Sequence, residues 1–374
     1  MKYNKFGNTG EMISALGFGC MRLPEYEKDG KWYLDEDECT EMLMHAYHNG
    51  VNYFDSAYYY SHSNNEAMMG KALSKVRGNV KMTTKLPMEL IEKPSDYRRI
   101  LEESLTRMGT DYVDYYHFWS LNREFFDEKI LKHNLLEEAQ KAKEEGLIRH
   151  ISFSFHDVPE TIKYIIDTAQ IMETMLVQYN ILDRRNEEMI AYAAQKGLGV
   201  VVMGPVGGGR LSIPSDLYQR LTGKPAVATY ELALRFVMGN PNISCALSGM
   251  TSMDVIDKNV AIASSDNYLT GEEWEKISEA NEQIKKFSDL YCTGCSYCQP
   301  CPANINIPQI FNLYTHHNVY GLTDFAREEY GLYLKNGGKT LKDCQGCGFC
   351  ERKCPQKLKI RQELARVEKI LSSL

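Results

Sequence analysis

Residues 45–57, HAYHNGVNYFDSA, hold the pattern that decides the fold: the end of a helical segment, a glycine, and a short apolar strand that stops at an acidic residue. Gly50 suits the C-terminal cap of a helix, where glycine adopts a positive φ without strain. The strand that follows is nearly continuous in apolarity, as is typical of a parallel strand covered on both faces. The same helix, glycine and strand unit recurs at residues 103–118, 141–155 and 192–204.

Extending this pattern along the chain gives eight expected strands separated by helical segments, at residues 14–19, 51–55, 80–86, 112–118, 149–154, 174–178, 199–203 and 244–248. Eight such units within about 265 residues match the usual size of a (β/α)₈ barrel. A doubly wound open sheet is the alternative, but it rarely needs eight units of such regularity. We therefore expect an α/β fold with a TIM barrel over residues 1–265.

Composition narrows the class of protein. The chain has 374 residues, 43% of them hydrophobic, with a formal net charge of −7, so a basic surface for nucleic acid is not expected. The sequence contains no run of about 18 apolar residues, so no membrane-spanning helix is expected. The first ten residues, MKYNKFGNTG, do not resemble a signal peptide. We expect a cytoplasmic protein whose thiols stay reduced.

The pattern changes after the eighth strand. The stretch LTGEEW places Thr270 three residues before Glu273, which predicts a capping box at the start of a helix. No strand is expected beyond it. Residues 266–374 therefore predict a second, small and mostly helical domain.

Eight of the 11 cysteines lie in two motifs of this second domain, CTGCSYCQPCP at 292–302 and CQGCGFCERKCP at 344–355. Three thiolates at intervals of three can bind three corners of a cubane cluster and leave the fourth iron to a distant cysteine. Zinc typically takes two separated pairs of ligands, and disulfides are disfavoured in a reducing compartment. We expect two 4Fe–4S clusters on Cys292, Cys295, Cys298, Cys301, Cys344, Cys347, Cys350 and Cys354.

The two motifs resemble those of two-cluster, bacterial-type ferredoxins, in which the cysteine before proline ligates the other cluster. This resemblance implies that Cys354 completes the first set of three cysteines and that Cys301 completes the second. In the first motif, two residues rather than three separate the third and fourth cysteines. The long separation of 42 residues between the motifs resembles that of the α-helical ferredoxins.

Three ionisable residues stand at the carboxyl ends of expected strands, where barrel enzymes keep their chemistry. Asp55 ends the second strand, Tyr60 follows in its loop, and Lys85 ends the third. A buried lysine beside a tyrosine lowers the pKa of the phenol, which could then protonate a carbonyl oxygen, and a paired aspartate keeps the lysine charged. From these residues alone, a helix cap at Asp55 and simple packing of YYY remain alternatives.

Longer blocks of sequence resemble a known family. KFGNTGEMISALGFGCMRL, FDSAYYYSHSNNEAMMGKAL, TTKL, DYVDYYHFW and GMTSMDVIDKNV are similar, in order and spacing, to blocks of the aldo-keto reductase superfamily. With its tail, the chain resembles the subgroup that carries a C-terminal ferredoxin domain. The resemblance implies a barrel that binds NADPH or NADH without a Rossmann fold, a small carbonyl or alcohol substrate, and Asp55, Tyr60 and Lys85 as the catalytic residues.

The chain departs from the family at the fourth strand. The position of the family's histidine holds Trp119, and His117 lies two residues earlier on the same side of the strand. We interpret His117 as a packed histidine one layer deeper in the barrel, below the substrate pocket. Trp119 would narrow the pocket and could donate its indole N–H to a substrate oxygen.

The resemblance also implies contacts to the nucleotide. Ser154 and Gln178 match residues around the carboxamide, although the family's asparagine after the serine is Phe155 here. Glycines after the seventh strand match the segment over the pyrophosphate, though such a run can also be a flexible turn, and residues after the eighth match the adenosine end. These further positions are Gly207, Gly208, Gly209, Arg210, Gly249, Thr251, Ser252 and Asn259. Val255 replaces an arginine that NADP-preferring members often have, so the sequence leaves NAD and NADP open.

Joining these two domains raises a question of electron number. A nicotinamide transfers two electrons as hydride, whereas each cluster transfers one, so direct exchange usually needs a flavin. No flavin motif is apparent, which leaves a flavin in the barrel, an external redox protein near the clusters, or structural or sensing clusters. We expect an iron–sulfur oxidoreductase in which NAD(P)-linked chemistry on a small carbonyl or alcohol is coupled to electron transfer. The alternative is a non-enzymatic electron carrier or redox sensor with a degenerate barrel.

Overall fold

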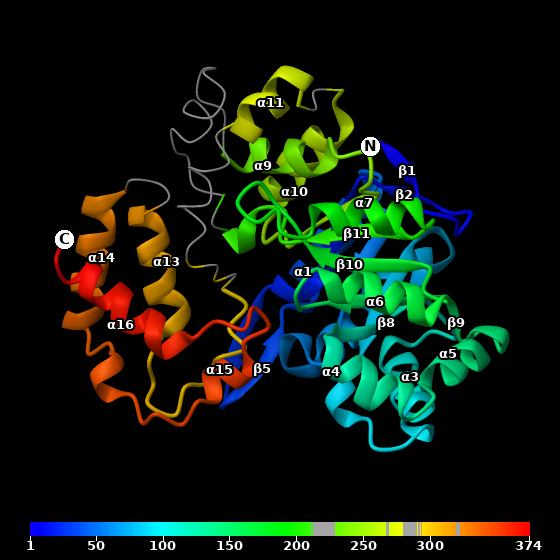
Figure 1. The fold of residues 1–374 in the computed structure, drawn as a ribbon, viewed down its shortest axis with the longest axis horizontal. Coiled ribbons are helices and arrows are strands. Elements are labelled where there is room, and N and C mark those ends of the chain that lie inside the picture. Colours follow the sequence, from blue (N-terminus) through cyan, green and yellow to red (C-terminus); the bar gives the residue numbers. More distant parts are fainter. Residues whose placement is uncertain are drawn as a thin grey trace. The chain divides into compact units, whose positions relative to one another are not determined.

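The protein is described by a computed structural model that covers residues 1–209, 211, 229–266, 269–279, 290, 292, 294–318 and 322–374 (Figure 1). It divides into two compact units. The first comprises Met1–Tyr179, Arg184–Pro205 and Leu234–Tyr268, and the second comprises Asn180–Asp183, Val206–Ala233 and Leu269–Leu374.

The first unit is built on a closed barrel of eight parallel strands. They are β3 (Leu16–Gly19), β6 (Tyr53–Asp55), β7 (Lys81–Leu86), β8 (Val113–Leu121), β9 (Ile148–Phe155), β10 (Thr174–Gln178), β11 (Gly199–Met203) and β12 (Cys245–Ser248). Strand β12 pairs with β3 and closes the cylinder. The expected TIM barrel is therefore confirmed, and the open sheet is excluded because it would leave two unpaired edges.

Helices surround this barrel and connect its strands (Figure 1). They are α1 (Glu36–His48), α2 (Asn65–Leu73), α3 (Ser95–Met108), α4 (Arg123–Phe125), α5 (Leu135–Glu144), α6 (Glu160–Ala169), α7 (Glu187–Gln195), α9 (Thr229–Met238) and α10 (Met253–Ser264). The glycines expected at helix ends all have positive φ, namely Gly50, Gly109, Gly146 and Gly197. Among the described residues, no helix combines the length and apolar character needed to cross a membrane.

A short N-terminal hairpin closes one end of the barrel. It pairs β1 (Tyr3–Lys5) with β2 (Met12–Ser14), and Phe6 between them packs on the rings of Tyr53 and Tyr115 at 6.0 and 4.8 Å. A Cβ atom at Gly199 would lie 2.1 Å from the Phe6 ring, so only glycine fits there. Because these contacts are at the start of the strands, the open end is the carboxyl end, where Asp55 and Lys85 lie.

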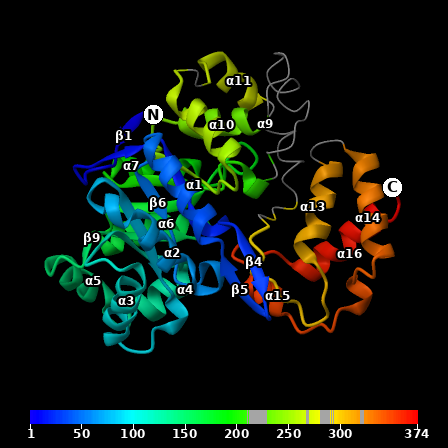
Figure 2. The ribbon, with the colours of Figure 1, turned by 180° about the vertical axis from the view of Figure 1, so that it is seen from behind.

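The second unit is helical in its described part, as expected. Its helices are α11 (Gly271–Glu279), α13 (Ile307–Asn318), α14 (Thr323–Lys335), α15 (Phe349–Lys353) and α16 (Ile360–Leu371). Helices α13, α14 and α16 lie side by side (Figures 1 and 2). The buried faces of these helices, which include Ile310, Phe311, Leu364 and Val367, form one core. Residues of both cysteine motifs pack into the same core.

A carboxylate at the other end of the barrel wall gives the first testable prediction. Glu173 accepts hydrogen bonds from Lys143, His150 and the backbone N–H of Ile151 at 2.6, 2.8 and 3.0 Å. Burial would raise the pKa of Glu173, but these hydrogen bonds hold it at about 2. Because that value is below the ordinary one, Glu173 contributes stability above pH 4.5 that is lost as pH falls toward 2.

We expect Glu173→Gln to lower the free energy of unfolding at pH 7 by roughly 2 kcal/mol. Urea denaturation between pH 7 and pH 3 checks this, and the gap between variant and wild type should close as pH falls. A gap that stays constant with pH would contradict the assignment. Glu144→Gln, at an exposed position nearby in the sequence, is the control.

Candidate active site and iron–sulfur centres

A buried ion pair lies at the open end of the barrel. The Lys85 ammonium donates to Asp55 Oδ2 at 2.7 Å and to the carbonyl oxygen of Ser56 at 2.6 Å. Thr83 donates to the other carboxylate oxygen of Asp55 at 2.7 Å. The Lys85 side chain is 1% exposed and that of Asp55 3%. Burial lowers the pKa of Lys85, and Asp55 opposes that shift by stabilising the charged ammonium.

Tyr60 completes the trio that the sequence picked out. The Lys85 Nζ atom lies 4.6 Å from the centroid of the Tyr60 ring. A cation at that distance is attracted to the ring and favours negative charge on the phenol. The structure thus brings Asp55, Lys85 and Tyr60 together at one place.

The loop that carries Tyr60 has an unusual backbone. Ser61, His62 and Ser63 follow it with φ of 50°, 54° and 68°, in the left-handed region that non-glycine residues rarely adopt. The buried side chain of Asn65 holds the loop by donating to the Ser61 hydroxyl at 3.2 Å. Strain of this kind persists only where surrounding contacts fix it, and it gathers at functional sites.

A second hairpin, which the sequence did not predict, supports the same loop. It pairs β4 (Glu25–Lys28) with β5 (Lys31–Leu34) after the first barrel strand. The Trp32 indole stacks on the His62 ring at 5.3 Å, and the Trp32 carbonyl accepts from Asn64 at 3.1 Å. Trp32 therefore positions the loop that follows Tyr60.

We expect Trp32→Ala to lower kcat for carbonyl reduction by about tenfold, because it releases a loop that positions Tyr60. Steady-state kinetics with a fixed nucleotide and a series of aldehydes measures the effect. Tyr33→Ala, on the opposite face of the same strand, is the matched control and should leave kcat unchanged. Equal losses in both variants would mean that the hairpin acts only through stability.

His117 is buried, as expected, but it also faces the ion pair. Its Nδ1 lies 2.7 Å from Ser152 Oγ, and its Nε2 lies 3.8 Å from Asp55 Oδ1. Burial and the charge of Lys85 lower its pKa well below the ordinary value, so the imidazole is neutral. Strand β7 pairs with β8 in a register that sets Lys85 opposite His117, so the histidine lies beside the lysine in the barrel wall.

Trp119 lies on the exposed side of the trio. Its ring meets Tyr60 edge to face at 5.9 Å and Tyr59 at 5.7 Å, and its side chain is half-buried. The strand continues to Leu121 with a bulge at Ser120, whose φ is 56°. Trp119 thus packs directly on the ring of the candidate proton donor Tyr60.

The predicted nucleotide residues lie in three settings. Ser154 Oγ accepts from Ser120 N–H at 2.7 Å, and Gln178 lies against Gly204, to whose carbonyl oxygen its Nε2 donates at 3.4 Å. Ser252 caps α10 by accepting from Val255 N–H at 3.4 Å. The other predicted positions are Gly249 and Thr251, which are exposed, and Asn259, which is buried and donates to Ser248 Oγ at 3.1 Å.

The glycine segment belongs to the second unit. Gly207, Gly208 and Gly209 have φ of 61°, 68° and 98°, which explains why glycine occupies all three positions. Arg210 lies outside the described residues.

Sequence reasoning missed a cation near the start of α10. Arg22, which follows the first barrel strand, packs so closely on Gly249 that a Cβ there would lie 3.3 Å from the arginine side chain. A helix N-terminus with an arginine beside it suits an anionic ligand such as a phosphate. The signal in the sequence is an arginine three residues beyond the end of the first barrel strand.

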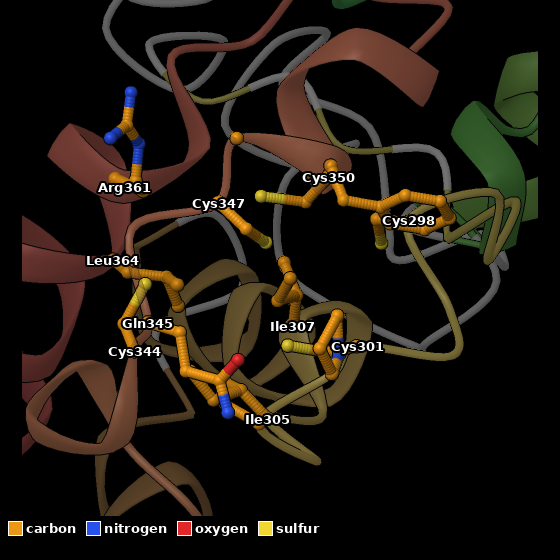
Figure 3. Close-up of a pocket in the computed structure, with 14 residues that line it drawn as sticks. Cys298, Cys301, Ile305, Ile307, Cys344, Gln345, Cys347, Cys350, Arg361 and Leu364 are labelled. Atoms are coloured by element: carbon orange, nitrogen blue, oxygen red, sulfur yellow. The ribbon is translucent and has the colours of Figure 1, made fainter.

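Three cysteines of the second motif, Cys344, Cys347 and Cys350, line a pocket together with Cys301 and Cys298 of the first. Figure 3 shows the sulfurs of Cys301, Cys347 and Cys350 directed toward one opening. Burial raises the pKa of Cys350, and Cys301 is among the charges that raise it further. Cys301 therefore lies with three cysteines of the second motif in a pocket that Cys298 of its own motif also lines.

The remaining cysteines form the other group. Burial raises the pKa of Cys298, and the neighbouring thiols of Cys292, Cys295 and Cys354 add to the shift. Among the described residues, no three His, Cys, Asp or Glu side chains converge as ligands of a single ion. A cubane binds each thiolate to a different iron, so four thiols around a pocket fit a 4Fe–4S cluster.

Comparison with known proteins places this geometry in a family. The model of the "Aldo/keto reductase family" matches residues 15–282. The chain belongs to the aldo/keto reductase family. A second model, "4Fe-4S dicluster domain", matches residues 291–360, so this aldo/keto reductase carries a ferredoxin domain with both cysteine motifs.

Its relatives are oxidoreductases. L-galactose dehydrogenase of Arabidopsis thaliana is 27% identical over 311 residues, which cover 76% of this chain and 94% of the relative. Versiconal hemiacetal acetate reductase of Aspergillus parasiticus is 27% identical over 338 residues, covering 75% and 96%. The chain is an aldo/keto-reductase-like oxidoreductase.

Solved structures agree on the fold. The holo form of an aldo-keto reductase from Bacillus halodurans superposes with a TM-score of 0.65 at 27% identity, over 75% of this chain and 96% of the other. An aldo/keto reductase from Klebsiella pneumoniae, solved with NADP and acetate, gives 0.63 at 23% identity, over 75% and 95%.

Proposed function

We propose that this oxidoreductase interconverts a small carbonyl compound and its alcohol in the barrel, with NAD(P) as the hydride carrier, and exchanges electrons through two 4Fe–4S clusters. Residues 1–265 would perform the first task and residues 266–374 the second. The observation that carries the proposal is the buried Lys85 ammonium, held by Asp55 at 2.7 Å and lying 4.6 Å from the centroid of the Tyr60 ring.

The proton in this reaction would come from Tyr60. Reduction of a carbonyl adds a hydride to carbon and a proton to oxygen, and NAD(P)H when bound supplies the hydride. The Lys85 cation stabilises the phenolate that remains on Tyr60, and Asp55 with the Ser56 carbonyl keeps that cation in place. In alcohol oxidation the same phenolate takes the proton back.

Trp119 and His117 would define the substrate space. Trp119 stands where the resemblance implies a histidine, so it would leave the carbonyl oxygen with Tyr60 as its main donor. Its ring narrows the approach to the phenol, which favours small or flat substrates. The neutral His117, whose Nε2 lies 3.8 Å from Asp55, would line the inner side of this space without adding charge.

The nucleotide proposal uses residues from two ends of the site. Ser154 and Gln178 would bind the carboxamide, and Gly249, Thr251, Ser252 and Asn259 would surround the adenosine end. Arg22 beside the α10 N-terminus adds a positive charge for a nucleotide phosphate. For the pyrophosphate, the family resemblance offers the glycines at 207–209 and Arg210.

Coupling to the clusters requires the electron pair of the hydride to be passed singly. A flavin bound in the barrel, or a one-electron partner protein, would supply the single-electron steps. Extraction of bound cofactors from anaerobically purified protein separates these cases, because a flavin is released on denaturation and seen by its fluorescence.

The proposal is tested by screening NADH and NADPH against aldehydes, ketones and quinones, with protein purified anaerobically. We expect nucleotide binding by fluorescence quenching and turnover of at least one carbonyl class. Absence of nucleotide binding together with absence of turnover in every combination would refute it.

A further inference from the structure

The segment that surrounds the second cysteine motif has a charge opposite to that of the whole chain. Residues 339–361 contain seven Lys or Arg and two Asp or Glu, whereas the chain has a net charge of −7. All seven basic side chains are exposed: Lys339, Lys342, Arg352, Lys353, Lys357, Lys359 and Arg361. We call these seven residues the basic face.

One thiol within this basic segment reaches the surface. Of the eight motif cysteines, all of them described, Cys347 alone is exposed. Arg352 donates to the Cys347 carbonyl oxygen at 2.9 Å, and Arg361 lines the same pocket as Cys347 (Figure 3). A cluster held there would have its most accessible edge at this thiol, with the positive charges of Arg352 and Arg361 beside it.

Two classes of cation can be separated within the basic face. Arg361 pairs with Glu351 at 2.9 Å, and Lys339 lies 3.6 Å from Asp343. In contrast, Lys342, Lys353, Lys357 and Lys359 form no ion pair with any described residue. The arginines fix the loops of the motif, so their charge has a local role, but the four lysines leave their charge available to a partner.

Uncompensated positive charge around an electron-transfer site selects negatively charged partners and speeds their encounter. Nucleic acid also carries negative charge, yet the exposed Cys347 of this segment is a candidate ligand of a redox cluster, for which a phosphate backbone has no use. A protein that delivers or accepts an electron needs a docking surface of opposite charge and a redox centre close to that surface. The basic face has positive charge and lies in the segment that carries the second cysteine motif.

We propose that the basic face docks a small acidic one-electron carrier protein, of the ferredoxin or flavodoxin type, with its redox centre against Cys347. This inference rests on the proposed function for its role in turnover, because it names the partner that supplies single electrons. In the exchange, the reduced carrier loses one electron and the cluster gains one. No bond is made or broken and no proton is transferred.

Binding is tested without turnover, using holoprotein with both clusters and an oxidised plant-type 2Fe–2S ferredoxin as the probe. Titration calorimetry at several salt concentrations gives the dissociation constant and its ionic-strength dependence. We expect the double variant Lys353→Glu/Lys357→Glu to weaken binding by about tenfold or more and to flatten the salt dependence. Lys75→Glu/Lys369→Glu, with the same charge change at exposed unpaired positions elsewhere, should bind like wild type.

Three results would overturn the proposal. They are no binding of ferredoxin or flavodoxin by wild type at low salt, equal affinity in the two double variants, or tighter binding of duplex DNA or of basic cytochrome c than of ferredoxin. Iron content and visible absorption confirm that each variant retains its clusters. Carbonyl turnover with NAD(P)H is measured in parallel, so loss of docking with intact turnover separates a wrong partner from a wrong proposed function.

Discussion

Replacing Tyr60 by phenylalanine is expected to lower kcat for carbonyl reduction by about 10²- to 10⁴-fold, the range that a positioned general acid contributes. The change removes the phenolic oxygen and keeps the ring that packs against Trp119 and lies over Lys85. Nucleotide binding should therefore be unchanged. Stopped-flow measurement of a single turnover isolates this step from product release.

Tyr59→Phe is the matched control, because Tyr59 also contacts Trp119. Burial raises the pKa of Tyr59 to about 12, the wrong direction for a proton donor at neutral pH. Its loss should change kcat less than about threefold. Turnover that survives in Tyr60→Phe but is lost in Tyr59→Phe would contradict the assignment of Tyr60 as the proton donor.

The second large effect concerns the clusters. Cys301→Ala is expected to remove one cluster and about half of the iron, since Cys301 lies in the pocket of the second motif. If Cys301 and Cys347 ligate the same cluster, the double variant Cys301→Ala/Cys347→Ala loses no more iron than either single variant. Cys298→Ala/Cys347→Ala should lose both clusters.

Iron analysis and EPR of the reduced variants measure these outcomes. An uncrossed arrangement, with each motif holding its own cluster, predicts instead that Cys301→Ala/Cys347→Ala loses both clusters, whereas Cys298→Ala/Cys347→Ala loses both in either arrangement. Cys39→Ser is the control, because Cys39 is buried in the barrel unit beside the Pro24 carbonyl and belongs to neither motif. It should keep the full iron content.

Local rules explain how much of the fold could be predicted. The residue that ends a helix often needs a positive φ, which glycine adopts without strain. Gly50, Gly109 and Gly197 all have positive φ, so these glycines marked the helix ends in the sequence. The capping box was equally local: Thr270 N–H donates to Glu273 at 2.8 Å, and Glu273 N–H donates back to Thr270 at 3.3 Å. Apolar runs of five or six residues then located the barrel strands.

The rest depends on contacts between distant segments. The hairpin at residues 25–34 is short, polar and exposed, so periodicity does not mark it, and its role appears only when Trp32 meets His62. Alternation along β8 placed His117 inside the barrel, but its 3.8 Å approach to Asp55 depends on how β7 and β8 align. Arg22 reaches Gly249 across more than 200 residues of chain.

The central claim is that chemistry at the Tyr60 site and the two clusters form one electron path. Anaerobic holoprotein, mixed with NADPH or NADH in the presence of a catalytic amount of flavin or of the one-electron carrier and followed by visible absorption and EPR, tests it most directly. The account predicts bleaching of the cluster absorption and the appearance of reduced-cluster EPR signals at a rate that falls when carbonyl substrate is added. Clusters that stay oxidised while the nucleotide is consumed at the full rate would contradict it.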